Sequence, residues 1–347
     1  MPLLYAGIDE AGYGPLLGPL CVGCAALVVP DAAGDAAPAS PGDPTPPPCL
    51  WKALSAAVCR TTTDRRRRIA VEDSKKLKGA KDAALHPLRH LERGVAAFAS
   101  AVAGAPAEWA DDDALLAALG AHAAPPPEGD AWHDAPLPLP VGNDAAALRI
   151  SGAMLRTALA KAGIEAASLS VRALDAREFN RLAARVSNKA TINFMAAAGH
   201  VDRVRRLAAG RGNDAWIALD RQGGRTGYLD PLRTSFPDAA LAVLEESEAT
   251  ARYRLRWPAG GGLPAHAATV SFELGGEERN LPIALASMAA KFARELHMRR
   301  LNAFFARHVP GLAPTAGYVQ DGRRFLEDVA PAAERLGIAR EALVRSI

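Results

Sequence analysis

The sequence contains few cysteines, lysines and aromatic residues. Its 347 residues include four cysteines and eight lysines, and Phe, Trp and Tyr together make up 5%. Four cysteines in so long a chain do not indicate a disulfide framework. Cys21 and Cys24 are three apart in an apolar, strand-like run, so their side chains should point to opposite faces of a sheet. Because no second such pair completes a zinc site, we expect both to be small buried residues.

A long hydrophobic run and a strong net charge are also missing. The most apolar early segment, 19–30, has about a dozen residues, whereas a membrane helix needs ~20. No basic segment followed by an apolar one opens the sequence, so we expect no secretory signal, no membrane contact and a cytoplasmic location. The net charge of +3 does not by itself indicate nucleic-acid binding. Nothing in the sequence suggests oligomers, so we expect a monomer.

The order of apolar runs favours an α/β protein with one domain over residues 1–347. Strands are expected at 5–9, 20–29, 214–219, 241–244, 251–257 and 268–274, the first two as a hairpin. Helices are expected at 50–70, 85–104, 111–119, 150–162, 176–207 with breaks, 282–307 and from near Ala332, with a polar turn at 72–77. Two Pro/Ala-rich segments, 30–48 and about 121–140, are predicted to be surface insertions.

Acidic residues follow two of the expected strands. Asp9 and Glu10 end the first strand, and Asp220 ends the strand 214–219. Neighbouring carboxylates in a regular strand face opposite ways, but the glycines after Glu10 should end the strand and release it from that alternation. A cluster of such acids requires a cation, and carboxylates suit Mg²⁺ or Mn²⁺. Taken singly, each acid is more often a solvated turn residue.

A polar stripe marks the long helix expected from Pro282. Ser287, Lys291 and Glu295 are spaced four apart on a helix that is otherwise rich in alanine and apolar residues. A charged stripe on a mostly buried helix points into a site, although spacing alone also fits a solvent-facing Lys–Glu pair.

Two other patterns have ordinary alternatives. Gly12, Gly14 and Gly18 imitate a dinucleotide-binding loop, but the third glycine is one residue late and two acids precede the loop. The run Arg65–Arg68 could bind phosphates, although a solvated charge run is the commoner case.

Five sequence blocks, in order, resemble the type 2 ribonucleases H (ribonucleases HII and HIII). The opening block is Gly7-Ile8-Asp9-Glu10-Ala11-Gly12-Tyr13-Gly14-Pro15-Leu16-Leu17-Gly18-Pro19, and the second is Asp73-Ser74-Lys75-Lys76-Leu77. Asp220 after an apolar strand matches the third block. The remaining blocks are Ala286-Ser287-Met288-Ala289-Ala290-Lys291-Phe292-Ala293-Arg294-Glu295 and Gly317-Tyr318. Tyr13 stands where this family has Arg or Lys, Glu295 where Asp is usual, and Val319 follows where Gly is usual.

The resemblance implies a ribonuclease H-like mixed β-sheet flanked by helices, with a helical C-terminal part. It implies hydrolysis of the RNA strand of RNA/DNA hybrids, or incision at ribonucleotides embedded in DNA, by two Mg²⁺ or Mn²⁺ ions, leaving 5′-phosphate and 3′-hydroxyl ends. The implied metal ligands and catalytic residues are Asp9, Glu10, Asp220 and Glu295. The implied substrate-binding residues are Gly12, Tyr13, Gly14, Ser74, Lys75, Lys291 and Tyr318. Two alternatives remain: a catalytically weak nucleic-acid-binding relative, and a metal-dependent nuclease with another nucleic-acid substrate.

Overall fold

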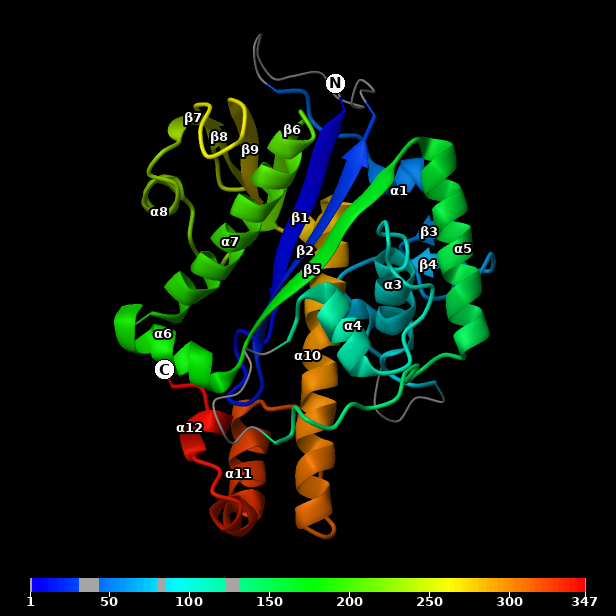
Figure 1. The fold of residues 1–347 in the computed structure, drawn as a ribbon, viewed down its shortest axis with the longest axis vertical. Coiled ribbons are helices and arrows are strands. Elements are labelled where there is room, and N and C mark those ends of the chain that lie inside the picture. Colours follow the sequence, from blue (N-terminus) through cyan, green and yellow to red (C-terminus); the bar gives the residue numbers. More distant parts are fainter. Residues whose placement is uncertain (1, 31–43, 80–84, 123–130, 187, 347) are drawn as a thin grey trace.

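A mixed seven-stranded sheet forms the centre of the protein (Figure 1). The computed structural model describes residues 2–30, 44–79, 85–122, 131–186 and 188–346. The strand order is β5-β2-β1-β6-β9-β8-β7. The strands are β1 (Leu3–Ala11), β2 (Leu20–Val29), β5 (Glu165–Leu174), β6 (Asp214–Asp220), β7 (Ala240–Glu246), β8 (Thr250–Trp257) and β9 (His266–Glu273). β1, β6 and β9 run parallel, and the other neighbouring pairs are antiparallel. The predicted β1–β2 hairpin is confirmed.

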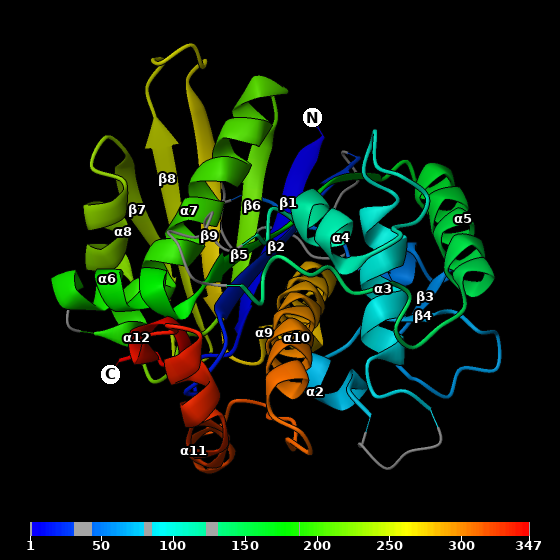
Figure 2. The same cartoon turned by 60° about the horizontal axis from the view of Figure 1, so that its bottom comes forward.

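Helices cover both faces of this sheet, as Figures 1 and 2 show. α10 (Leu281–His308) lies on one face, where Gly7 and Gly23 let its backbone approach: a Cβ on either would lie 2.1–2.2 Å from backbone atoms of α10. α7 (Lys189–Gly210) lies on the other face. The remaining helices are α1 (Leu50–Ala53), α2 (Ser74–Leu77), α3 (Arg89–Ala99), α4 (Asp112–Leu119), α5 (Ala145–Ala162), α6 (Ala176–Val186), α8 (Leu229–Ser235), α9 (Gly276–Arg279), α11 (Val319–Arg335) and α12 (Arg340–Leu343). The predicted sheet with flanking helices and a helical C-terminal part is confirmed.

The two cysteines of β2 lie on opposite sides of the sheet. Cys21 belongs to the apolar cluster under α10, and Cys24 to the cluster under α7. Burial raises the pKa of each thiol to about 12, so both are neutral and unreactive at pH 7. The prediction that they are small buried residues is confirmed.

Three expectations about elements were wrong, and one strand was missed. The helix expected over 50–70 ends at Ala53, and a two-stranded parallel ribbon follows, β3 (Val58–Cys59) with β4 (Ile69–Ala70), because the three threonines and the aspartate at 61–64 do not favour a helix. The polar turn at 72–77 contains α2, which the Asp73 side chain caps by accepting the Lys75 N–H. β5 was missed because small and polar residues interrupt its apolar pattern. The last long helix begins at Val319, not near Ala332, and it includes Pro331.

The two proposed insertions are described only in part. Residues 31–43 and 123–130 lie outside the described residues, whereas 44–49 and 131–140 are irregular apart from a bridge at Pro138. Their role as insertions and the single-domain organisation remain predictions. Within the described residues, no helix is both long and apolar enough to cross a lipid bilayer.

Candidate active site

Three acidic side chains lie near one another where the parallel strands β1, β6 and β9 end. Asp9 comes from β1, Asp220 ends β6, and Glu277 lies in α9, which follows β9. The Glu277 carboxyl is close enough to Asp9 to raise the pKa of Asp9, and the Gly276 N–H donates to Asp220 Oδ1 at 2.8 Å. Because parallel strands finish at one edge of the sheet, residues more than 200 positions apart are brought together here.

This group of acids carries more negative charge than its surroundings balance. Asp9 is 7% exposed, and burial followed by the charges of Glu10, Glu277 and Asp220 raises its pKa well above the usual value. Burial also raises the pKa of Asp220, against the effect of the Gly276 amide. Neighbouring carboxylates repel one another unless one is protonated or a cation lies between them. The group therefore needs either a proton or a cation.

Glu277 was not predicted from the sequence. Gly275 and Gly276 follow an expected strand directly and precede Glu277, just as Asp9 and Asp220 follow theirs. Ser287 of α10 hydrogen-bonds both to Glu277 and to Ser74 Oγ, the latter at 3.0 Å. The strand-end rule that selected Asp9 and Asp220 would also have selected Glu277.

Glu10 lies on the opposite face of β1 from Asp9. β1 stays paired with β2 as far as Ala11, so the alternation of side chains continues past Glu10, and the expectation that glycines would release it was wrong. Asp9 faces α9, while the Asn193 side chain of α7 lies near Glu10. Burial raises the pKa of Glu10, and the Asn193 side chain opposes that shift. Glu10 therefore joins the acids from the α7 side of the strand end.

Glu295 is held by two lysines instead of joining the acids. Its carboxylate lies 2.7 Å from Lys78 Nζ and 3.1 Å from Lys291 Nζ. Burial alone would raise the pKa of Glu295, but both lysines hold it below the usual value. Ser287, which touches Glu277, precedes Glu295 by eight residues, about 12 Å along a helix. The structure thus brings neither Glu295 nor Lys291 to Asp9, Asp220 and Glu277.

The glycine loop lies beside the acids and is built for close approach. Gly12 has φ +87°, and a Cβ there would lie 2.6 Å from the Pro19 carbonyl oxygen, so only glycine fits. Gly14 is exposed, with open space where a side chain would be. Tyr13 is half-buried, and Lys189 Nζ of α7 lies 4.5 Å from the centre of its ring. A cation therefore stands beside the phenol that occupies the loop's central position.

Hydrogen bonds from residues late in the sequence hold this loop in place. Gly317 O accepts the Leu16 N–H at 2.7 Å and the Leu17 N–H at 3.1 Å. The buried Arg294 donates to the carbonyls of Leu17 and Ala316, and Arg345 donates to the Gly12 carbonyl at 2.6 Å. Tyr318, which follows Gly317 and caps α11, is 54% exposed. Its ring is therefore accessible next to the seated loop.

Ser74 and Lys75, at the start of α2, lie on the acid side of the site. Ser74 is buried against Ser287, whereas Lys75 is exposed and acts electrostatically on both Glu10 and Asp220. In the part of the chain that the structure describes, no three Asp, Glu, His or Cys side chains converge closely enough to hold an ion as they stand. The oxygen ligands are nevertheless of the kind that Mg²⁺ and Mn²⁺ prefer.

Comparison with protein-family models gives no match, and comparison with curated proteins gives none. Among solved structures, ribonuclease HII of Archaeoglobus fulgidus in complex with PCNA is 13% identical at a TM-score of 0.39, covering 99% of this chain and 93% of that one. Ribonuclease H2 of Pyrococcus horikoshii is 14% identical at a TM-score of 0.41, covering 98% and 92%. Bst-RNase HIII in complex with Mn²⁺ is 14% identical at 0.44, covering 99% and 66%. These are distant likenesses, so any activity has to be argued from the site residues.

Proposed function

We propose that this protein is a metal-dependent nuclease that hydrolyses the RNA strand of RNA/DNA hybrids, or cuts at ribonucleotides embedded in DNA. The observation that carries this proposal is the group of unbalanced acids at the ends of β1, β6 and β9, directly beside a glycine loop. A structural role does not require carboxyls that repel one another, whereas a metal site does. The five sequence blocks that resemble type 2 ribonucleases H support the same activity.

Asp9, Asp220 and Glu277, with Glu10 from the other side of β1, would hold the metal. Their ligands are all oxygens, which favours Mg²⁺ or Mn²⁺ over softer ions. The closeness of the Asp9 and Glu277 carboxyls fits this role, because a cation bound between them would offset their repulsion. When bound, such ions activate water and stabilise negative charge on the leaving oxygen. In this proposal Glu277 takes the position that the sequence resemblance gave to Glu295.

The chain's other residues would position the substrate. The exposed backbone of Gly14 and the close turn at Gly12 would let the loop approach a ribose 2′-hydroxyl, which distinguishes RNA from DNA. Lys75 and Lys189 flank the acids and would neutralise neighbouring phosphates, while Tyr13 offers a ring for stacking. Ser287 would orient Glu277 through its hydrogen bond.

Cleavage of three labelled substrates tests the proposal. These are an RNA/DNA hybrid, a DNA duplex with one embedded ribonucleotide, and an all-DNA duplex, each with Mg²⁺ or Mn²⁺. We expect the first to be cut to 5′-phosphate and 3′-hydroxyl ends, and we expect Asp9→Asn to abolish the cut. The second substrate reports whether Tyr13 and Lys189 support recognition of a single ribonucleotide.

The all-DNA duplex is the specificity control. Cutting of DNA at the same rate as the hybrid would replace the ribonuclease by a nuclease of another specificity. Folded protein that cuts none of the three, while still binding the hybrid, would contradict the enzyme and favour the nucleic-acid-binding relative.

A further inference from the structure

A loop rich in arginine begins close to the acids and has no role in the proposed cleavage reaction. Residues 60–68, here the arginine loop, connect β3 to β4. Its side chains Arg65, Arg66 and Arg67 are exposed, and none forms an ion pair with an acidic side chain among the described residues. Three neighbouring guanidiniums without acidic partners form a concentrated positive patch, which favours an anionic ligand.

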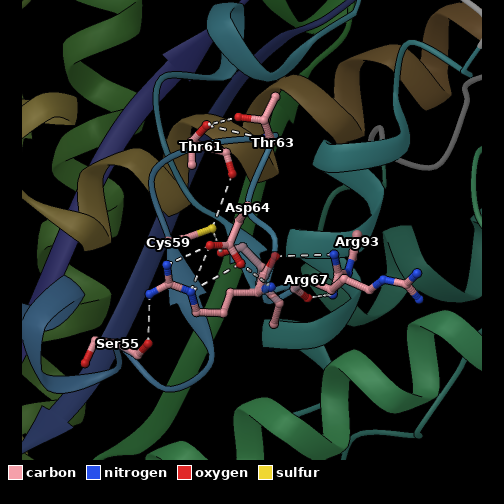
Figure 3. A network of polar contacts seen from close by, with 9 residues as sticks. Ser55, Cys59, Thr61, Thr63, Asp64, Arg67 and Arg93 are labelled. Carbon is pink, nitrogen blue, oxygen red and sulfur yellow. Dashed lines mark hydrogen bonds and ion pairs between the residues drawn. The ribbon is translucent and has the colours of Figure 1, made fainter.

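Polar contacts fix the shape of this loop, as Figure 3 shows. Asp64 Oδ1 lies 2.7 Å from Arg68 Nη2, and Asp64 Oδ2 accepts the Arg68 N–H at 2.9 Å. Arg93 of α3 donates to the carbonyls of Arg67 and Arg68, and Arg68 donates to Ser55 O at 3.0 Å. Arg68 and Arg93 thus hold the backbone, which leaves Arg65, Arg66 and Arg67 free to bind.

The backbone at Arg67 is strained. Its φ is +55°, and Arg67 is the one residue other than glycine with positive φ in the described parts of the chain. An L-residue with a long side chain disfavours this left-handed conformation, which persists only where the surroundings determine it. Glycine would remove the strain, so an arginine here points to a use for the side chain.

The arginine loop starts at the edge of the acid site. Arg60 pairs with Glu72 at 2.9 Å and also donates to the Glu278 carbonyl, next to Glu277. Lys76 of α2 pairs with the Glu278 carboxylate at 2.9 Å. Arg60 and Arg66 are six positions apart, so the chain between them can extend over at most about 20 Å. A duplex that rises ~3.4 Å per base pair covers that distance in about six base pairs.

We infer that the arginine loop is a second binding site for the phosphate backbone of a nucleic-acid duplex, outside the site of cleavage. Guanidinium forks match phosphate oxygens in pairs, and contacts of this kind carry no sequence preference. The loop consists of Thr, Asp and Arg without an apolar side chain to enter a lipid bilayer, which favours a duplex over an anionic membrane. The inference rests on the proposed function in one respect: the duplex that binds the arginine loop is taken to be the one that reaches the acids.

Salt-dependent binding by the full chain tests this inference. The variant R65S/R66S/R67G removes three charges and gives position 67 the residue its backbone favours. The matched control R203S/R206S/R211S removes three exposed arginines at the far end of α7 and beyond, so each variant has a formal charge of 3 − 3 = 0. Binding of a labelled hybrid of about 24 base pairs is measured by fluorescence anisotropy in EDTA at several KCl concentrations.

We expect the loop variant to bind at least about 10-fold more weakly at low salt, and its log–log salt slope to be shallower by about 2 to 3, since each phosphate contact contributes ~0.9. The control should stay within about 2-fold of the unaltered protein and keep its slope. A second variant, R65E/R66E, leaves position 67 untouched and should weaken long-hybrid binding further.

Unchanged slopes in both loop variants, with circular dichroism confirming their fold, would overturn the inference. Equal losses in the α7 control would also overturn it, because net charge would then be the cause. Binding to phosphatidylserine vesicles but not to duplex, lost in the loop variants, would replace the duplex by a membrane. If the protein cuts no substrate but the loop variants lose slope, the proposed function fails while this inference stands. Normal cleavage with unchanged slopes would support the proposed function and overturn this inference.

Discussion

Glu277 and Glu295 are two glutamates near one long helix, and their surroundings differ in charge. Glu277 lies just before α10, faces Asp9 and Asp220, and accepts a hydrogen bond from the Ser287 hydroxyl of that helix. Glu295 lies within α10, and lysines contact it at 2.7 Å and 3.1 Å. The first is surrounded by like charge, whereas the second is neutralised.

The difference teaches that charge balance, more than residue type, distinguishes a candidate metal ligand from a structural acid. A carboxylate paired with two ammonium groups would have to give up both before binding a cation. A carboxyl that lies beside other unbalanced carboxyls gains from any cation that arrives. The predictions below test this contrast, from the largest expected effect to the smallest.

Asp112 is a fully buried acid that, like Glu295, is neutralised by a neighbouring cation. Its carboxylate lies 2.6 Å from Arg300 Nη2, and the two side chains are 0% and 2% exposed. Asp112→Asn should lower the free energy of unfolding by about 3 kcal/mol, because it leaves a buried guanidinium without its main partner. Urea unfolding measures the effect, and Asp113→Asn, which removes the half-exposed neighbour, is the control. Equal losses in the two variants would contradict the argument.

Exchanging the two glutamates for glutamine separates their roles in cleavage. Glu277→Gln should lower kcat/KM on the hybrid at least about 100-fold, equivalent to about 2.7 kcal/mol, because it removes an oxygen ligand and its charge. Glu295→Gln should lower it less than about 5-fold. Steady-state cleavage at saturating Mn²⁺ provides the measurement. The reverse order would restore Glu295 as the fourth acid.

Stability should respond in the opposite sense. Glu295→Gln should lower the free energy of unfolding by about 1–2 kcal/mol at pH 7, because two lysines lose their acceptor. Since the lysines lower the folded pKa of Glu295, its contribution is present above the unfolded pKa and is lost as the pH falls through the folded value. The difference between this variant and the unaltered protein should therefore shrink below about pH 4.5.

Glu277→Gln is the matched variant for that stability measurement. In EDTA at pH 7 it should lose no stability, because it removes repulsion from Asp9 and Asp220. Urea unfolding from pH 3 to 7 checks both variants. A loss for Glu277→Gln as large as that for Glu295→Gln would show that both acids are structural.

The smallest effect concerns the cation beside the glycine loop. Lys189→Met removes the charge 4.5 Å from the Tyr13 ring, and we expect KM for the hybrid to rise about 3-fold with kcat unchanged, as for one lost phosphate contact. Lys161→Met, in the last turn of α5, is the control. A fall in kcat with KM constant would instead place Lys189 among the groups that act on the reacting phosphate.

Local pattern was enough to predict much of the sheet and of α10. The apolar runs at 20–29 and 214–219 match β2 and β6 because both strands are buried on both faces. Pro282 identified the start of α10, where its missing N–H has no cost. β5 escaped notice because its serines and an arginine lie among buried positions, and only pairing with β2 shows that they belong to a strand.

Asp9 and Asp220 could be chosen from the sequence because each follows a strand, but the choice between Glu277 and Glu295 could not be settled by spacing. The regular interval from Ser287 to Glu295 suggested a stripe that points into a site. The lysine that completes the neutralisation, Lys78, is 217 positions away in the sequence. Contacts between such distant residues depend on the whole fold, and local spacing does not contain them.

The hydrogen bonds that hold the glycine loop in place form late during synthesis of the chain. Gly12 is made early, whereas Arg345, which donates to its carbonyl, is 333 positions later. At ~5–20 residues per second, the ribosome needs roughly 15 to 70 s to cover that interval. A nascent chain therefore carries Asp9 and Glu10 long before the loop beside them has its supports. Any cleaving activity should accordingly emerge only after α11 and α12 have left the ribosome.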